Sequence, residues 1–269
     1  MKMTDYDELK EKAMEKTKEK MKEKKEERDQ IAIQVINTID NLDKTSNTML
    51  EQFKDIYSLY FPELEKEIED PDLFLELATE IRNKDKFTEE NLKGRLEDKE
   101  KIEKINEKAK KSTGADLSQE DMKRITEIGE IALKMRRERK ELDEYLEEIM
   151  EEAAPNLTEI LGSTVGARLL SEAGSLKKLA MMPSSTVQVL GAEKALFAHL
   201  NKDVKPPKHG IIFQYPQIKG SPRDKRGKIS RKVAAKASIA SRIDQFDGEY
   251  KGDELKEKLE EEIEKVLEE

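Results

Sequence analysis

Apolar residues recur every three or four positions along two long stretches of the chain. The first stretch runs from residue 29 to residue 64, and the second from residue 122 to residue 149. Such spacing, kept over roughly four heptads in each stretch, predicts two helices packed as an antiparallel pair. The stripe positions are Ile31, Val35, Leu42, Met49, Phe53, Ile56 and Tyr60 in the first helix, and Met122, Ile125, Ile128, Ala132, Met135, Leu142, Leu146 and Ile149 in the second.

The segment between these two stretches carries the signals of a helical connection. Pro62 and Pro71 break the chain, and the apolar run at 73–77 predicts a short helix after the second break. Residues 112–116 read STGAD, which is typical of a turn, and Ser118 followed by two acidic residues predicts the start of the returning helix. Pro155 then ends this helical arm.

The ends of the chain differ from the arm in composition. Residues 1–28 have few apolar positions and dense Lys/Glu spacing, which favours a charged, solvated helix. Residues 248–269 predict a second, acidic helix with one apolar stripe. We therefore divide the chain into a charged N-terminal helix at 1–28, a coiled-coil arm at 29–154, a compact domain at 155–247 and an acidic C-terminal helix at 248–269.

Composition narrows the class of protein. Charged residues make up 41% of the chain and hydrophobic residues 35%, which suits an exposed helical arm with a small core. The chain has no Cys, so disulfides and thiol chemistry are excluded. There is no apolar run long enough for a membrane span and no apolar segment of a signal peptide, from which we expect a cytoplasmic protein.

Charge is distributed very unevenly. Residues 162–244 contain 16 Lys/Arg and 5 Asp/Glu, a net charge of +11, whereas the whole chain carries −9 and the remainder therefore −20. Polyanions respond to local potential, so a basic segment within an acidic protein predicts nucleic-acid binding.

The end of the basic segment has a clear helical pattern. On a helix over 228–242, the small apolar side chains of Ile229, Val233, Ala237 and Ala240 share one side. Ser221 and Pro222 are expected to cap this helix. Few acidic residues lie nearby to form intrahelical pairs, which favours RNA binding over an ordinary solvated face. The cations expected to face RNA are Lys228, Arg231, Lys232, Lys236 and Arg242.

Several blocks of sequence resemble the Nop-domain family, the scaffold proteins of box C/D guide ribonucleoproteins. The blocks read GAEKALFAHL, PKHGIIFQYP and RGKISRKVAAKASIASRID, preceded by LGSTVGARLLSEAGSLKKLAMMPSSTVQVLG and, in the arm, by IQVINTIDNLDKTSNTMLEQFKDIYSLYFPEL. They occur in order over about residues 29–246. The resemblance implies an all-α fold in which a long antiparallel coiled-coil arm precedes a compact helical Nop domain, in a protein of an archaeal cell that serves rRNA 2′-O-methylation.

The resemblance also implies partners. Such scaffolds bind a kink-turn (box C/D) RNA only together with a kink-turn-binding protein of the ribosomal-protein-like family. We expect that protein to meet the surface near Leu169, Leu176 and Leu179, although each of these leucines also suits a core position. The arm self-associates in archaeal relatives, and its apolar tip, with Leu73, Phe74 and Leu77, would permit a homodimer. Residues 1–28 do not resemble the fibrillarin-binding domain of full-length members, so fibrillarin recruitment is left open.

The resemblance changes the interpretation of residues 211–213. Their propensity predicts a buried strand, but the family implies a packed loop between helices. Gln214 and Tyr215 follow this apolar anchor and are expected to present an amide and a ring to RNA. Lys194, Lys208 and Arg226 complete the expected RNA-binding set. Glu193 is expected to pair with an arginine.

No catalytic constellation is present. The chain has two His and no Cys, so a Cys/His zinc site is impossible, and neither metal nor cofactor is expected. Residues 220–229 lack the spacing and the Ser/Thr of a phosphate-binding P-loop. We therefore expect an RNA–protein scaffold and not an enzyme. The alternative is a coiled-coil interaction protein whose basic domain binds nucleic acid nonspecifically.

Overall fold

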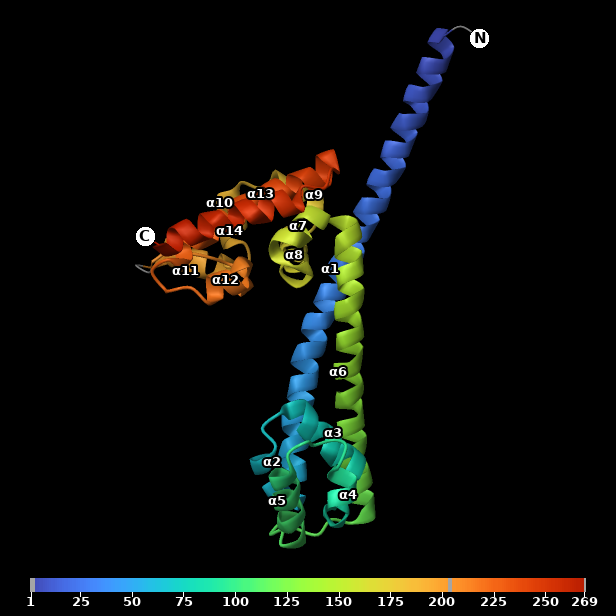
Figure 1. Ribbon diagram of the computed structural model, residues 1–269, viewed down its shortest axis with the longest axis vertical. Coiled ribbons are helices and arrows are strands. Elements are labelled where there is room, and N and C mark those ends of the chain that lie inside the picture. The colour runs from blue at the N-terminus through green and yellow to red at the C-terminus, as the bar shows by residue number, and fades with distance from the viewer. Residues whose placement is uncertain (1–2, 203–204, 269) are drawn as a thin grey trace. The chain divides into compact units, whose positions relative to one another are not determined.

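The computed structural model describes residues 3–202 and 205–268, with side chains from Glu27 onward except that of Asp247. Within these ranges the chain is almost entirely helical, and Lys93 and Leu96 form an isolated bridge outside the helices (Figure 1). The all-α fold class is therefore confirmed. Among the described helices, none has an apolar stretch of the length needed to span a bilayer.

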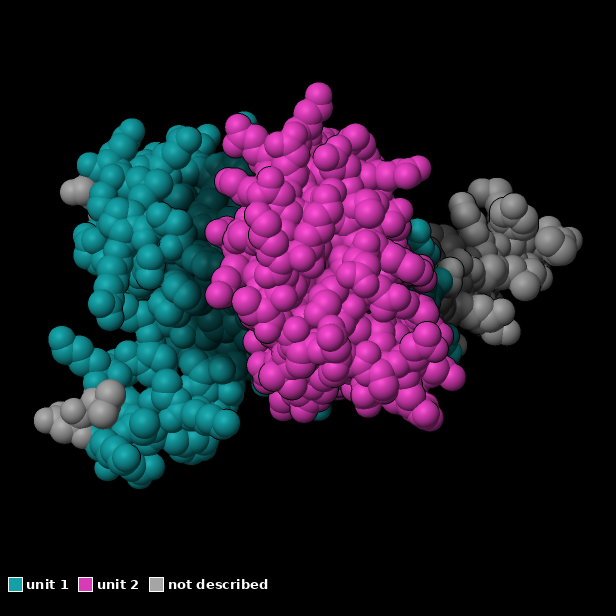
Figure 2. Space-filling model, turned by 90° about the horizontal axis from the view of Figure 1, so that it is seen from below, with its two compact units in different colours: residues 1–38, 142–269 teal, residues 39–141 magenta. Residues whose placement is uncertain are grey.

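The chain divides into two compact units (Figure 2). Unit 1 comprises residues 1–38 and 142–269, and unit 2 comprises residues 39–141. Two helices, α1 (Met3–Tyr60) and α6 (Gln119–Ala153), contribute residues to both units. The boundaries of the units are set by which residues pack together. They therefore fall inside residues 29–154, the segment that the sequence pattern predicts to be one arm.

In unit 2 the two long helices run antiparallel. Arg139 Nε donates to Asp43 Oδ1 at 2.9 Å, and Arg136 Nη2 donates to Asn47 Oδ1 at 2.8 Å. Residue numbers rise along α1 while they fall along α6, which is the direction predicted from the two apolar stripes. Ser118 begins α6 as expected, because its hydroxyl accepts from the Asp121 N–H at 3.1 Å and the Asp121 carboxylate accepts from the Ser118 N–H at 3.2 Å.

Short capped helices connect α1 to α6. Asp70, Thr88 and Asp98 each accept a hydrogen bond from a backbone N–H in the first turn that follows, which satisfies donors that a helix start leaves without a partner. Pro71 occupies the first position of its helix, where no N–H is needed. The helices are α2 (Pro62–Glu67), α3 (Pro71–Ile81), η1 (Lys84–Lys86), α4 (Glu89–Leu92) and α5 (Lys99–Lys110).

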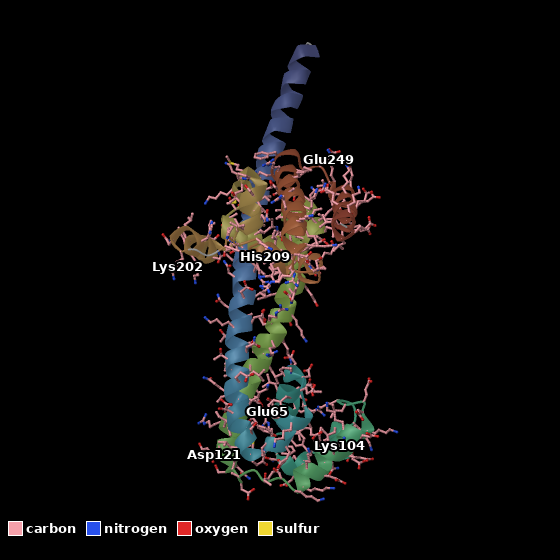
Figure 3. The ribbon with its side chains drawn as sticks, turned by 90° about the vertical axis from the view of Figure 1, so that its left-hand side faces the viewer. Glu65, Lys104, Asp121, Lys202, His209 and Glu249 are labelled. Atoms are coloured by element: carbon pink, nitrogen blue, oxygen red, sulfur yellow. The ribbon has the colours of Figure 1, made fainter. Side chains whose placement is uncertain are left out.

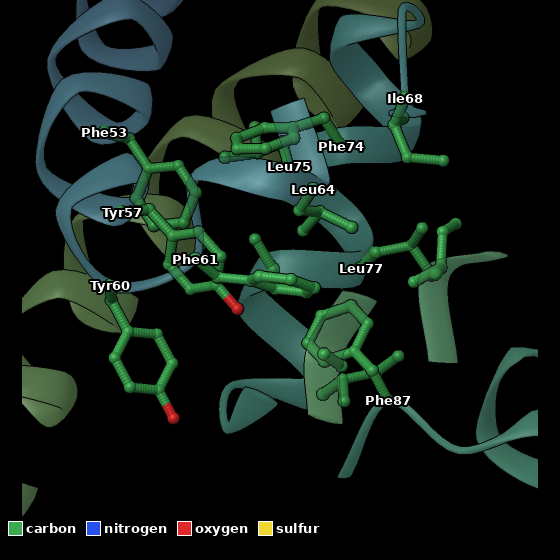
Figure 4. Close-up of a cluster of buried hydrophobic side chains, with 14 of the residues drawn as sticks. Phe53, Tyr57, Tyr60, Phe61, Leu64, Ile68, Phe74, Leu75, Leu77 and Phe87 are labelled. Carbon is green, nitrogen blue, oxygen red and sulfur yellow. The ribbon is translucent and has the colours of Figure 1, made fainter. Parts of the chain in front are cut away.

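Aromatic rings form the core of unit 2 (Figure 4). Phe53 and Tyr57 stack with centroids 5.5 Å apart, and Phe74 meets both rings edge-on. Phe74 and Leu77 have no exposed surface, while Leu73 is partly buried against the same cluster. The prediction that Phe74 and Leu77 contribute to a dimerisation surface is therefore wrong for this conformation, because both side chains are buried within one unit, whereas for Leu73 it stays a prediction.

We expect Phe74→Ala to destabilise unit 2 by about 3–5 kcal/mol, because it removes a buried ring from a close-packed cluster. Urea denaturation followed by circular dichroism measures the change. Glu103→Ala, which shortens an exposed side chain of α5 in the same unit, is the matched control and should change stability by less than about 0.5 kcal/mol. A Phe74→Ala protein of unchanged stability would contradict the assignment of Phe74 to the core.

In unit 1 the other helices pack around α13 (Arg226–Arg242). It contacts α7, α9, α10 and α14, and Ile229, Val233, Ala237 and Ala240 are buried in these contacts, as their spacing predicts. The expected cap at Ser221 and Pro222 is wrong, because a turn at 223–225 comes before the helix. The remaining elements are α7 (Pro155–Leu161), α8 (Ser163–Ala173), α9 (Leu176–Met181), α10 (Ser184–Val189), α11 (Glu193–Asn201), η2 (Ile211–Gln214), α12 (Pro216–Lys219), η3 (Ile243–Asp247, a π-helix) and α14 (Gly252–Glu268).

Two buried carboxylates cap helices of unit 1 from far along the sequence. Asp244 accepts from the backbone N–H groups of Asn156 at 3.0 Å and Leu157 at 2.9 Å, at the start of α7, and from the Asn156 amide at 2.7 Å. Asp29 of α1 accepts from the Leu176 N–H at 2.7 Å, at the start of α9. Each carboxylate thus holds the start of a helix against an element distant in sequence.

Replacing Asp244 with Ala leaves three buried donors without an acceptor, so we expect a loss of about 3 kcal/mol in the free energy of unfolding. Asp224→Ala, an exposed position in the turn before α13, should change stability by less than about 0.5 kcal/mol. Chemical denaturation of both variants provides the comparison. Equal stabilities would show that the Asp244 hydrogen bonds contribute little.

Candidate nucleic-acid interface

The backbone around residues 208–214 is fixed against α10. The N–H groups of Gly210 and Ile211 donate to the carbonyls of Gln188 and Leu190, each at 2.9 Å, and the Gln188 side chain donates to the Lys208 carbonyl at 2.7 Å. A Cβ on Gly210 would lie 1.9 Å from the Leu190 oxygen, so this approach requires glycine. Residues 211–214 form a short 3₁₀ helix with Ile212 buried. They are therefore neither the strand favoured by propensity nor the loop implied by the resemblance.

The side chains of Phe213, His209 and Arg226 lie together beside this turn. The His209 ring, labelled in Figure 3, stacks on Phe213 with centroids 4.3 Å apart and planes 14° apart. The Arg226 guanidinium lies 5.4 Å from the Phe213 centroid. Arg226 also donates to the carbonyls of Ser221 at 2.9 Å and Lys219 at 3.0 Å. These bonds orient Arg226 and occupy part of its donor set.

Burial, followed by the positive charges of Arg226 and Lys208, lowers the pKa of His209 below its usual 6.5. A hydrogen bond of its own backbone opposes the shift only in part. The imidazole is therefore neutral at physiological pH. It contributes a ring and hydrogen-bonding nitrogens to this surface, and the net charge comes from its neighbours.

Gln214 and Tyr215 differ in exposure. Gln214 is exposed, and its side-chain oxygen accepts from Arg168 of α8. Tyr215 is 8% exposed, and burial raises the pKa of its phenol. The prediction that the Tyr215 ring stacks on RNA is therefore wrong for this conformation, because the ring is covered. Arg168 was missed by the sequence analysis, although it is the lone cation of α8 and stands out in that block.

Apart from Arg226 and Arg242, the cations of α13 fall into two groups. Lys228 and Arg231 are exposed, and the stem of exposed Lys208 lies against Gly227, where an added Cβ would be 3.4 Å from Lys208 Cδ. We call Lys208, Lys228 and Arg231 the cationic strip. Because Gly227 and Arg231 are one helical turn apart, the strip joins the 208–210 segment to the first half of α13.

The second group pairs with an acidic side chain of α14. Lys236 Nζ lies 2.8 Å from Glu262 Oε1, and Lys232 Nζ lies 3.2 Å from Glu262 Oε2. The hydrogen bond from Lys236, reinforced by that from Lys232, lowers the pKa of the Glu262 carboxyl. In this conformation the Lys236 side chain is largely covered, contrary to the prediction, whereas the Lys232 side chain is 44% exposed and its RNA-binding role stays a prediction. The sequence argument considered acidic residues near α13 in the chain and overlooked α14.

Arg242 has a structural role. Its Nε donates to the Ala180 carbonyl at 3.0 Å and its Nη2 to the Met182 carbonyl at 3.4 Å. These bonds satisfy carbonyls at the C-terminal end of α9. The side chain is exposed as well, but its replacement would disturb α9 in addition to any RNA contact.

α11 presents an unusual surface, because none of its residues is buried. Lys194 is exposed there, together with the apolar side chains of Leu196, Phe197 and Leu200. Glu193 accepts from the Gly191 N–H at 2.8 Å, so the prediction that it pairs with an arginine is wrong. The exposed apolar side chains of α11 were not singled out in the sequence analysis.

The leucines expected to meet a partner protein are interior. Leu169 and Leu179 have no exposed surface and Leu176 is 1% exposed, so they form core packing and not a docking surface. Among the described residues, no group of His, Asp and Glu side chains could hold a metal ion. The polar side chains of the site are cations, amides and a neutral imidazole, which suit phosphate binding.

The depressed pKa of His209 predicts a pH dependence of stability. Above pH 6.5 the imidazole is neutral in both the folded and unfolded states; as the pH falls below 6.5, the unfolded state takes up a proton first and stability decreases. His209→Phe keeps a ring against Phe213 but cannot titrate. Between about pH 7.5 and about pH 5.5, the melting temperature of the wild type should therefore fall more than that of His209→Phe. An equal fall in the melting temperatures of the two proteins would contradict the lowered pKa of His209.

Comparison with known proteins finds a family whose sequence model matches this chain. The sequence model of the Nop family, described as "snoRNA binding domain, fibrillarin", matches residues 38–268. The chain is 47% identical over 227 residues to a NOP5 family protein of Methanocaldococcus jannaschii, covering 84% of this chain and 54% of that protein. It is 40% identical over 222 residues to nucleolar protein 56 of Schizosaccharomyces pombe, covering 81% of this chain and 45% of that protein. The chain thus spans about half the length of these curated relatives.

A solved structure is also similar. A chain in the crystal structure of a fibrillarin/Nop5p complex superposes with a TM-score of 0.55 at 27% sequence identity. The match covers 98% of this chain and 80% of the other. The cationic strip and the His209–Phe213 stack lie within the residues matched by the family model.

Proposed function

This chain belongs to the Nop family, and we propose from that premise that it is an RNA-binding scaffold of a box C/D guide ribonucleoprotein. The observation that carries the proposal is the cationic strip of Lys208, Lys228 and Arg231, which is exposed on unit 1 of an otherwise acidic chain. Exposed lysines and arginines along one helix face provide the electrostatic contact that phosphates require.

The proposed ligand is a kink-turn (box C/D) RNA already bound by a kink-turn-binding protein. The strip supplies phosphate contacts, and the exposed Gln214 amide beside Arg168 offers a hydrogen-bonding group for an unpaired nucleotide. A single strip of three cations is a small surface for tight binding, which supports joint recognition with a second protein. The contacts of Phe213 with His209 and Arg226 hold the backbone next to Lys208 in place, which would lower the ordering cost of binding at that position.

Self-association and assembly with fibrillarin are also proposed. Self-association of the arm is proposed through exposed apolar side chains such as Leu59 and Ile131 of unit 2, since Phe74 and Leu77 are interior. Fibrillarin enters as a member of the same assembly, because the similar solved structure is a complex with fibrillarin and the family description names it. The proposed setting is the cytoplasm of an archaeal cell, where such a particle would serve rRNA 2′-O-methylation.

The double variant Lys208→Glu/Arg231→Glu tests the function. It reverses two charges of the strip and leaves the structural Arg226 and Arg242 in place. We expect at least about tenfold weaker binding to a preformed complex of kink-turn RNA and kink-turn-binding protein, and a shallower dependence on salt, because two phosphate contacts are lost. Fluorescence anisotropy with labelled RNA across a salt series measures both quantities.

The control is Lys99→Glu/Lys104→Glu, which makes the same charge change at exposed positions of unit 2 and should bind as the wild type does. Unchanged binding by the strip variant would overturn the proposal. Naked kink-turn RNA should bind weakly to the wild type, since the partner supplies part of the contact surface. Equal competition by an unrelated RNA of the same length would favour nonspecific binding by a coiled-coil interaction protein.

A further inference from the structure

The acidic helix α14 lies along α13, the helix that carries most of the strip (Figure 1). It has eight Asp/Glu and three Lys between Gly252 and Glu268, a net charge of −5. A buried apolar stripe of Leu255, Leu259, Ile263 and Val266 holds it in unit 1. Burial of this kind makes α14 a fixed part of the unit, so its carboxylates stay beside α13 in the absence of any ligand.

α14 holds cations along much of the length of α13. Lys225, just before α13, donates to the Leu267 carbonyl, while Lys232 and Lys236 share the Glu262 carboxylate at 3.2 and 2.8 Å. Residue numbers rise along α13 and fall along α14 in these contacts, so the two helices run antiparallel.

The pairing with Glu262 is partly shielded from solvent. The Lys236 side chain is 11% exposed and the Glu262 side chain 32%. An ion pair so placed is screened less by salt than a fully exposed pair. The Lys232 side chain is 44% exposed, so Glu262 competes with a phosphate for Lys232, whereas it covers most of what Lys236 could offer.

We propose that α14 is an internal competitor of RNA: Glu262 competes with phosphates for Lys232 and Lys236 and so lowers the contribution of these two lysines to polyanion binding. This inference rests on the RNA binding proposed above. The sequence-independent part of RNA affinity grows with the number of cations that neutralise phosphates. Withholding two cations weakens binding to arbitrary RNA and leaves the contacts of the strip in place. Glu262 is thus a specificity-determining residue.

Removal of the Glu262 charge tests the proposal on an RNA without a kink-turn. The probe is a labelled oligouridylate of about 20 nucleotides, long enough to span one OB-fold-sized site. Glu262→Gln should bind it about five- to tenfold more tightly at low salt, with a salt dependence steeper by about 1.4, the value for two added contacts to a single strand. Glu261→Gln, which removes an equal charge one residue away, should match the wild type.

Three further variants trace any gain in affinity to Lys232 and Lys236. Glu262→Gln/Lys232→Gln/Lys236→Gln should return to the affinity of the wild type. In the wild-type background, Lys232→Gln/Lys236→Gln should change affinity for oligouridylate by less than about twofold, since these lysines are already occupied, whereas Lys208→Gln/Arg231→Gln should weaken it. This last pair of variants tests the proposal even where Glu262→Gln folds poorly, as judged by its melting temperature.

Several outcomes would overturn the proposal. They are an unchanged affinity of a folded Glu262→Gln protein, an equal gain in Glu261→Gln, a gain that persists in the triple variant, and a loss of affinity in Lys232→Gln/Lys236→Gln as large as that in the strip variant. These results are distinct from failure of the proposed function. The kink-turn assay can be negative while Glu262→Gln still gains affinity for oligouridylate, and the reverse is equally measurable.

Discussion

The buried carboxylate of Asp244 is the interaction on which the arrangement of unit 1 depends. A carboxylate without exposed surface is stable only where hydrogen bonds replace its water, and here three donors from Asn156 and Leu157 do so. The bond network continues from the Asn156 side chain to the backbone of Glu249 and Lys251, which leads into α14. The start of α7, the end of α13 and the start of α14 are thereby held at one point.

That junction has consequences for charge. Because the segment after α13 is held at Asn156, α14 turns back along α13 and brings Glu262 against Lys232 and Lys236. Two exposed cations of α13, Lys228 and Arg231, lie in its first half, near Lys208. A hydrogen-bonded junction at one end of the helix thus determines which side chains along it meet solvent, and through them which surface is proposed to meet RNA.

Many cations of the basic segment serve the fold before they serve any ligand. Arg226 satisfies carbonyls before α13, and Arg242 satisfies carbonyls at the end of α9. Guanidinium groups suit this work because their several donors reach more than one carbonyl at once. A high local positive charge is therefore a sound indication of a polyanion surface, but it overstates the number of side chains that such a surface contains.

The sequence by itself determined the features that depend on near neighbours. Helical periodicity predicted the antiparallel pair in unit 2 and the buried row of α13, and the spacing of Ser118 and Asp121 predicted the start of α6. Each follows from interactions within one or two turns. The resemblance to the Nop-domain family, which the family comparison confirms, supplied the class of function.

The tertiary structure alone decided the features whose partners are distant. Asp29 and Leu176 are 147 residues apart, Asp244 and Asn156 are 88 apart, and Arg242 and Ala180 are 62 apart. No local pattern marks such pairs. Whether Tyr215, Phe74 and Leu179 are buried depends likewise on neighbours from elsewhere in the chain. Solvent exposure belongs to the packed molecule, so the sequence could name the candidate cations but could not choose among them.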